Sequence, residues 1–200
     1  MGRPAQHDAD SLLDAAVRLV AEGGPRAVSM AAVARAAGGP SGSVYHRFAG
    51  RPALTAALWL RTVARFQEGW LAALAAEPAT TAGPRAARHV VAWSRANEAE
   101  ARVLLYGAAD FGEPEWAAAD RAELARLNAR IPAALRALAA RLGAEGPAAV
   151  ERIALATTDL PAATVRRHLR FGKASQGFPP YAEDLVESGA AALLILETCL

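Results

Sequence analysis

The chain has 200 residues, of which 53% are hydrophobic, with a net charge of +2 and a single cysteine, Cys199. This length fits one large domain or two small ones. These numbers exclude an internal disulfide and a uniformly basic nucleic-acid binder, and the sequence lacks the roughly 20-residue apolar run of a membrane-spanning helix. A reducing, cytoplasmic location is expected.

The first predicted helix starts near residue 10, with Asp10 or Ser11 as its cap and an apolar stripe that includes Leu12, Leu13 and Val17. The run 23–25, Gly-Gly-Pro, predicts its end. Alanine, leucine and arginine dominate the chain, and this composition favours an all-α fold.

A second and a third short helix follow, separated by a glycine turn. Ser29 is the expected N-cap of the second helix, and Gly38 or Gly39 supplies the turn. Pro40 suits the first position of the third helix, and Val44 and Phe48 are expected to pack it onto the other two. This layout is typical of a helix that enters the major groove of DNA.

The segment resembles the helix-turn-helix of the TetR family of bacterial transcriptional regulators. The similarity lies in an alanine-rich helix, the Ala37-Gly38 turn and the run Gly42-Ser43-Val44-Tyr45-His46, followed by Phe48. It implies a repressor that binds a palindromic operator as a homodimer and is released by a small-molecule ligand, without a cofactor. Many family members carry Lys or Arg where this chain has Ser41.

The candidate DNA-binding residues follow from this arrangement. The small side chains let the third helix approach base edges, Ser29 can offer its hydroxyl to a phosphate, and an arginine near the N-terminus can follow the minor groove. Tyr45, His46 and Arg51 match positions that meet phosphate oxygens in the family. The residues are Arg3, Ser29, Ser41, Gly42, Ser43, Tyr45, His46, Arg47 and Arg51.

Each of these residues also has a structural interpretation. Tyr45 could belong to the core, His46 could be a solvated surface residue, and Arg3 could lie in a terminus without a role. The charge pattern favours the functional interpretation, because no Asp or Glu occurs between Glu22 and Glu68. Six arginines lie in this acid-free window: Arg26, Arg35, Arg47, Arg51, Arg61 and Arg65.

Residues 1–50 are expected to form the DNA-binding domain and residues 51–200 a helical domain for ligand binding and dimerisation. A long helix starts at 50–52, Gly-Arg-Pro, and stops before Pro78. Gly83-Pro84 and Leu160-Pro161 are expected to interrupt helices. The remaining helices are predicted at 85–97, 100–109, 115–142, 147–158, 162–170 and 181–200.

Apolar and aromatic residues of the second domain could line an effector pocket, although such stripes are also typical of an ordinary core. The candidates are Trp59, Val63, Phe66, Trp93, Asn97, Leu104, Leu127, Asn128 and Ile131. The segments Pro147–Thr158 and Tyr181–Leu200 have apolar faces that predict a four-helix bundle with a second copy. Packing within one chain is the alternative.

Two other classes of function compete with a DNA-binding regulator. An enzyme is disfavoured because Asp110-Phe111-Gly112 lacks the other kinase motifs, and the four scattered histidines lack metal-ligand spacing. A helical interaction module with a degenerate head that no longer binds DNA is the second alternative, and the acid-free window argues against it.

Overall fold

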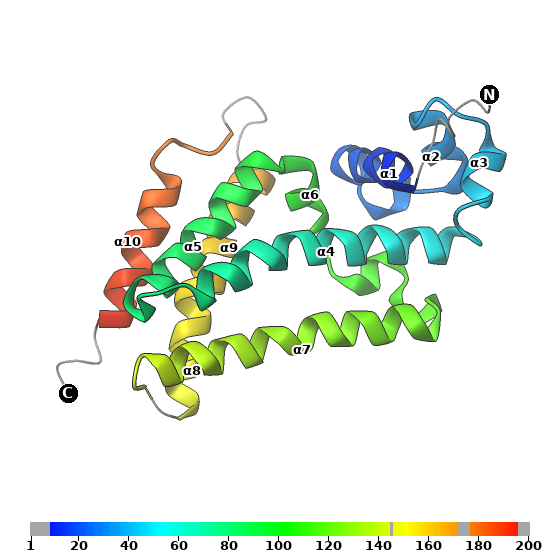
Figure 1. Cartoon of the computed structure of the whole chain (residues 1–200). Coiled ribbons are helices and arrows are strands. Elements are labelled where there is room, and N and C mark those ends of the chain that lie inside the picture. The colour runs from blue at the N-terminus through cyan, green and yellow to red at the C-terminus, as the bar shows by residue number, and fades with distance from the viewer. Residues whose placement is uncertain (1–8, 145, 172–176, 196–200) are drawn as a thin grey trace, which may run out of the picture. The chain divides into compact units, whose positions relative to one another are not determined.

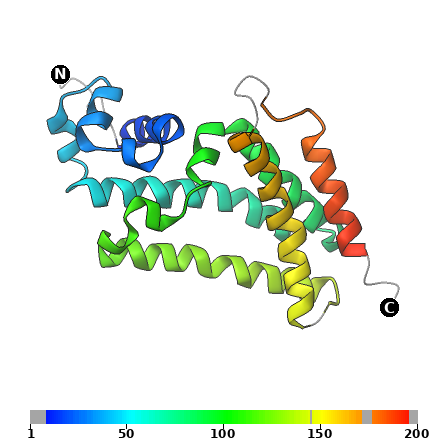
Figure 2. The same ribbon diagram turned by 180° about the vertical axis from the view of Figure 1, so that it is seen from behind.

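The computed structural model describes residues 9–144, 146–171 and 177–195, and every element within these ranges is helical (Figures 1 and 2). The predicted all-α fold is therefore confirmed. None of the helices in the described ranges has the length and apolarity that a bilayer crossing requires.

The chain forms two compact units. The first contains the described residues up to Val63 together with Ala99–Ala125, and the second contains Ala64–Glu98 together with the described residues from Arg126 onward. Two long helices, α4 (Arg51–Ala75) and α7 (Ala118–Arg141), contribute residues to both units. The domain boundary expected between residues 50 and 51 remains a prediction.

The first unit begins with three helices that bury one apolar face each. They are α1 (Ala9–Gly23), α2 (Met30–Ala36) and α3 (Ser41–Tyr45), with the short 3-10 turn η1 (Pro25–Ala27) after α1. Leu12, Val33 and Val44 are completely buried between them. The predicted cap of α1 is wrong, because Asp10 and Ser11 both lie inside the helix.

The second part of this unit is an aromatic cluster on residues 99–125. Here α6 (Glu98–Val103) is followed by the 3-10 turns η2 (Ala108–Phe111) and η3 (Glu113–Glu115), so the helix expected at 100–109 is shorter and ends earlier. Phe111 is fully buried, with its ring centroid 5.1 Å from that of Trp59. The indole Nε1 of Trp116 donates to the carbonyl oxygen of Phe111 at 3.1 Å.

The second unit is built around α5 (Ala79–Ala96), with α9 (Leu160–Arg166) and α10 (Ala182–Ile195) packed along it (Figure 2). Gly83 makes the approach of α10 possible, because a Cβ at this position would lie 2.3 Å from Cδ1 of Leu194. Helix α8 (Pro147–Ala154) leads through the π-helical turn η4 (Leu155–Asp159) into α9, and a second π turn, η5 (Arg167–Phe171), follows.

Two predicted helix interruptions are wrong. Pro84 lies inside α5, and Pro161 lies inside the continuous helical run from Pro147 to Phe171. A proline inside a helix leaves the carbonyl four residues earlier without its usual N–H donor. For Pro84 that residue is Thr80, which is exposed, so water can supply the missing hydrogen bond. For Pro161 the corresponding carbonyl belongs to Thr157, which is completely buried.

Arginines of α5 and α7 fasten the ends of other helices in the second unit. Arg95 donates to Glu183 at 2.7 Å and to the main-chain oxygens of Phe178 and Pro179, both at 2.8 Å. Arg88 pairs with Asp184 and Glu187 of α10, and these two acids raise the pKa of its guanidinium. Arg141 donates to the Leu74 carbonyl at the end of α4 at 2.7 Å.

Candidate nucleic-acid interface

The α2–turn–α3 segment has the capping that the sequence predicts. The Ser29 hydroxyl oxygen accepts a hydrogen bond from the amide of Ala32 at 3.1 Å, as expected of an N-cap. Gly38 has a φ of 73°, in the left-handed region that favours glycine, and it turns the chain between the two helices. Pro40 is the N-cap of α3, one position before its predicted place.

Helix α3 is anchored on one side and open on the other. Val44 is completely buried and Phe48 is 8% exposed, which confirms both as core residues. Tyr45 is 60% exposed, so its ring does not belong to the core. A Cβ built on Gly42 would meet nothing within 4 Å, so the first turn of α3 leaves room for another molecule to approach its backbone.

The Ser43 hydroxyl donates its proton to the Pro40 carbonyl at 2.7 Å. Its oxygen lone pairs therefore remain available as hydrogen-bond acceptors. His46 and Arg47, directly after α3, are both exposed. The backbone of Ser41 begins α3, whereas the side chain of Ser41 and the whole of Arg3 lie outside the described part of the chain.

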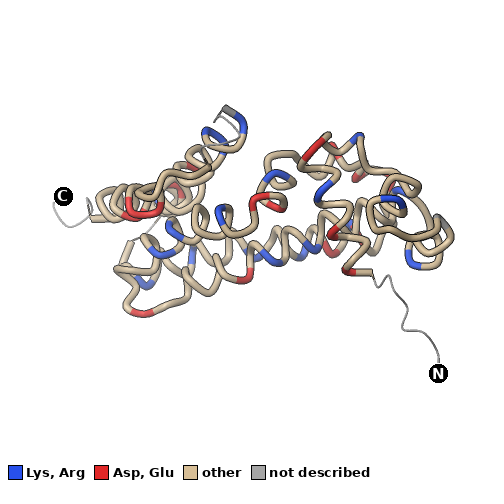
Figure 3. The backbone as a smooth tube through the Cα atoms, turned by 90° about the horizontal axis from the view of Figure 1, so that it is seen from above, with Lys and Arg blue, Asp and Glu red and all other residues tan. Residues whose placement is uncertain are grey.

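Figure 3 marks Lys and Arg in blue and Asp and Glu in red along the backbone. The arginines of the acid-free window differ in their surroundings. Arg61 pairs with two acids of α1, Asp10 at 3.1 Å and Asp14 at 2.7 Å, so its charge is compensated. Arg26, Arg35 and Arg47 are exposed and form no ion pair with any residue in the described ranges. These three provide the uncompensated positive charge around α2 and α3.

Arg51 has an internal role that the sequence did not reveal. Its Nε donates to the Val28 carbonyl at 3.0 Å, and one terminal nitrogen, Nη2, donates to the Pro25 carbonyl at 3.3 Å. The guanidinium thus fastens the start of α4 to the segment before α2. Its other terminal nitrogen, Nη1, forms no hydrogen bond with the described residues.

The predicted effector residues are distributed over both units. In the second unit, the rings of Phe66 and Trp93 meet edge to face, with centroids 5.3 Å apart. Asn97 ends α5 and donates its side-chain amide to the Trp93 carbonyl at 2.9 Å, and Asn128 lies exposed on α7. Trp59 and Val63 are buried on the α4 part of the first unit, Leu127 is buried, and Leu104 and Ile131 are half-buried.

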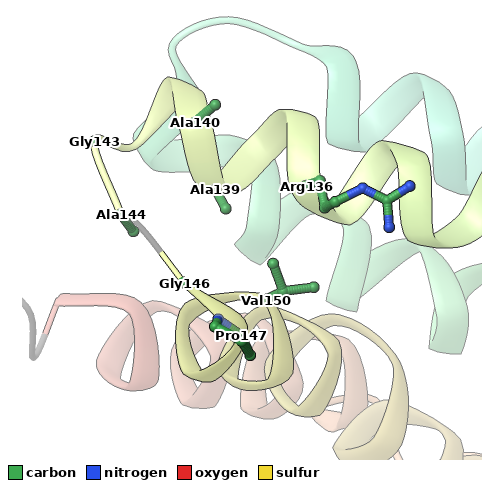
Figure 4. A pocket seen from close by; sticks show the side chains of 8 residues that line it. All are labelled: Arg136, Ala139, Ala140, Gly143, Ala144, Gly146, Pro147 and Val150. Atoms are coloured by element: carbon green, nitrogen blue, oxygen red, sulfur yellow. The ribbon is translucent and has the colours of Figure 1, made fainter.

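A separate groove of about 450 Å³ lies at the corner between α7 and α8 (Figure 4). Small and apolar residues form its walls, and Arg136 is the charged residue that lines it. The remaining lining residues are Ala139, Ala140, Gly143, Ala144, Gly146, Pro147 and Val150. None of the predicted effector residues lines this groove.

His89 of α5 contacts the α4 backbone. Its Nε2 lies 3.2 Å from the Phe66 carbonyl oxygen, and its ring occupies the space over Gly69, where a Cβ would come within 2.3 Å of Cε1. Burial lowers the pKa of this imidazole below its ordinary value, and the contact with the Phe66 carbonyl opposes the shift. Neutral His89 therefore packs between the two helices.

The helical fold and the exposed, basic-flanked α3 define a helix-turn-helix DNA-binding protein. Residues 12–58 match the family model described as bacterial regulatory proteins of the tetR family. This matched segment therefore belongs to the TetR family of bacterial regulatory proteins. The chain matches none of the curated protein sequences with which it was compared.

Solved structures resemble the whole chain. A transcriptional regulator from Rhodococcus sp. Rha1 is 20% identical, with a TM-score of 0.69 and 95% of both chains covered. The fatty acid degradation regulator FadR from Bacillus halodurans is 17% identical, with a TM-score of 0.70 and coverage of 97% of this chain and 96% of the other. FadR from Bacillus subtilis, in complex with stearoyl-CoA, is 15% identical, with a TM-score of 0.70 and coverage of 94% and 98%. At these identities the similarity establishes a shared fold.

Proposed function

We propose that the protein is a dimeric repressor that binds a palindromic operator and is released by a small-molecule effector. The observation that supports this most directly is α3, which is held by buried Val44 and presents exposed Tyr45 beside uncompensated arginines. A helix that must enter the major groove needs one such anchored side and one free side. Because the regulator must share a compartment with its DNA, the cytoplasm is its proposed location.

The contacts to DNA divide into positioning and reading contacts. Ser29 accepts from Ala32 and so keeps its own proton for a phosphate oxygen, and Arg51 keeps one terminal nitrogen for the same purpose. Tyr45, His46 and Arg47 extend this set on the exposed side of α3. Ser41, Gly42 and Ser43 are proposed to lie against base edges, and Arg3 is proposed to follow the minor groove.

The proposed dimer interface combines the exposed faces of α10 and of the Pro147–Phe171 run. Within the described ranges, five of the seven exposed large hydrophobic residues lie on these helices or directly before α10. They are Leu155, Leu160, Tyr181, Leu185 and Ile195. A second copy of the chain would remove this apolar surface from water, which is the usual driving force for association.

The charges on the Pro147–Phe171 run favour an antiparallel pairing with its own copy. Asp159 and Arg167 are both exposed, form no side-chain ion pair with another described residue, and lie four positions before and after Ala163. In a two-fold pair centred on Ala163, Asp159 of one subunit faces Arg167 of the other. The interface is thereby self-complementary, as a two-fold symmetric contact must be.

The effector is proposed to bind in the second unit, where Phe66 and Trp93 supply aromatic surface. The stearoyl-CoA found in the Bacillus subtilis FadR structure makes long-chain acyl-CoA the first compound to test. Binding would favour a conformation that fits the operator less well, and a difference of a few kcal/mol between the two states is enough for release.

The deciding experiment is selection of genomic fragments by the purified protein, followed by sequencing. We expect an inverted repeat whose half-sites are about 34–36 Å apart, or a multiple of this spacing. Adding stearoyl-CoA to the bound fragments then tests the effector. Fragments without any shared symmetric sequence would contradict the operator proposal, whereas selected fragments that stearoyl-CoA leaves bound would contradict only this effector class.

A further inference from the structure

Pro161 creates a buried hydrogen-bonding problem in the second unit. In an α-helix the carbonyl of Thr157 would accept from the amide of residue 161, and proline has no N–H. Thr157 is completely buried, so water cannot replace the missing donor. Pro132 of α7 poses no such problem, because the residue four positions before it, Asn128, is exposed.

A side chain of another helix donates to this carbonyl. Trp70 of α4, only 2% exposed, donates its indole N–H to the Thr157 carbonyl at 3.2 Å. The helix itself widens to a π turn at Leu155–Asp159, where the amide of Leu160 bonds to the carbonyl of Leu155. The usual α-helical bond to the Thr157 carbonyl is thus absent, and a side-chain bond from another helix is present.

The site is closely packed on its other sides. A Cβ at Gly83 of α5 would lie 3.6 Å from Cγ2 of Thr157 and 2.3 Å from Cδ1 of Leu194. The Thr157 hydroxyl donates to the Ile153 carbonyl at 2.8 Å and so does not need Trp70 as a partner. If Trp70 moved away, the buried Thr157 carbonyl would lose the indole donor, and Pro161 could not supply the usual α-helical amide in its place.

We propose that Trp70 is a positioning residue that joins α4 to the Pro147–Phe171 run, so that these two helices move as one body. Pro161 maintains this link because it prevents Thr157 from forming the usual helical bond. The consequence for DNA rests on the proposed function, since the Pro147–Phe171 run carries the proposed dimer face and α4 begins directly after the helix-turn-helix. A displacement of the dimer helix would then reach α4 through this bond.

A double-mutant cycle tests the link itself. Trp70→Phe keeps an aromatic ring and removes the N–H, so we expect the equilibrium constant for folding to fall about 10-fold. Pro161→Ala restores a main-chain donor for Thr157. In the Pro161→Ala background, Trp70→Phe should therefore cost much less, about 3-fold or below. Equal losses in the two backgrounds would overturn the proposal.

Hydrogen exchange tests the coupled motion, which a merely structural role would not affect. In the wild-type protein we expect the amides of residues 66–75 and 153–166 to exchange with a common rate. Trp70→Phe should separate the two rates, and adding Pro161→Ala should restore protection to residues 157–166 without restoring the common rate. A common rate that persists in Trp70→Phe would overturn the proposal.

The consequence for DNA is tested with the fragments that the wild-type protein selects. Trp70→Phe should remain dimeric, and its affinity for these fragments should differ from that of the wild type by at least about 3-fold. Unchanged affinity would refute the transmission to DNA. A wild-type protein that selects no fragments would count against the proposed function alone, because the stability cycle and the exchange rates do not depend on DNA.

Discussion

Arg51, the first residue of α4, donates from Nε to the carbonyl oxygen of Val28, which directly precedes the N-cap of α2. Arg47, four residues earlier, is exposed and forms no ion pair in the described part of the chain. Two neighbouring arginines of one basic segment thus have different surroundings, and their substitution should have different consequences.

Arg51→Ala is expected to lower the free energy of unfolding by about 1–2 kcal/mol, because two carbonyl oxygens lose a charged donor. Arg47→Ala is its matched control and should leave that free energy within about 0.5 kcal/mol. Both should reduce the slope of log affinity for DNA against log salt by about 0.9, if each contacts one phosphate. Urea unfolding and salt titrations measure the two effects. An unchanged slope for Arg47→Ala would remove this residue from the interface.

Ser43→Ala should change which operator is preferred more than it changes overall affinity. The hydroxyl proton is used on the Pro40 carbonyl, so in the proposed complex Ser43 would present only acceptor lone pairs to the groove. Acceptors match the amino groups of cytosine or adenine, and loss of one such contact costs about 1–3 kcal/mol of discrimination. Repeating the fragment selection with the variant measures this. A uniform loss of affinity across all sequences would place Ser43 on the phosphate backbone instead.

Gly189→Leu should convert the protein to a monomer without unfolding it. Gly189 lies on the exposed face of α10, and a Cβ there would meet nothing within 4 Å in the single chain. A bulky side chain therefore obstructs only a second copy. Gly189→Ala is the control, since it should keep the dimer and stabilise the helix by up to about 1 kcal/mol. Sedimentation velocity reports the assembly state, and a Gly189→Leu variant that sediments as a dimer would contradict the proposed interface.

Arg167→Asp should weaken the dimer, because it places acidic residues opposite each other in the proposed antiparallel pair. Combining it with Asp159→Arg reverses both charges and should recover the dimer, whereas Asp159→Arg alone should weaken it. The expected coupling is about 0.5–1 kcal/mol for a solvent-exposed pair and should decrease with salt. Dimer dissociation measured at low and high salt tests this. Independent, additive effects of the two substitutions would exclude the proposed register.

His89 should make the protein less stable as the pH falls. Burial lowers its pKa in the folded state, so below its ordinary pKa of 6.5 the unfolded chain binds a proton that the folded chain does not. The stability that neutral His89 contributes is thus complete above pH 6.5 and is lost as the pH falls through its folded pKa. His89→Gln keeps a donor for the Phe66 carbonyl and should lose less stability between pH 7 and 5. Identical pH profiles for the two proteins would show that His89 does not carry this dependence.

Local signals were sufficient to predict the helix-turn-helix. Ser29 caps α2, Gly38 adopts the positive φ of the turn, and Val44 and Phe48 face the core, all as their residue types and spacing indicate. Each of these properties depends on neighbours within one or two helical turns. The same holds for the start of α4 at Arg51.

Local signals could not predict which arginines have partners within the chain. Arg51 and Arg61 find their partners 23 and 51 positions away in the sequence, and only the folded chain brings these groups together. The sequence therefore indicated a basic segment, and the tertiary structure decided which of its charges remain uncompensated.

Prolines show the same division between local and tertiary control. The sequence determined where an amide donor is missing, at residues 84 and 161, and this predicted two interruptions. Whether a helix ends at a proline depends on whether another donor can form a hydrogen bond with the carbonyl four residues earlier. Thr80 is exposed to solvent and the Thr157 carbonyl accepts from the Trp70 indole, and both helices continue through their prolines. That outcome is a property of the packed chain, because solvent access and a donor 87 positions away exist only after folding.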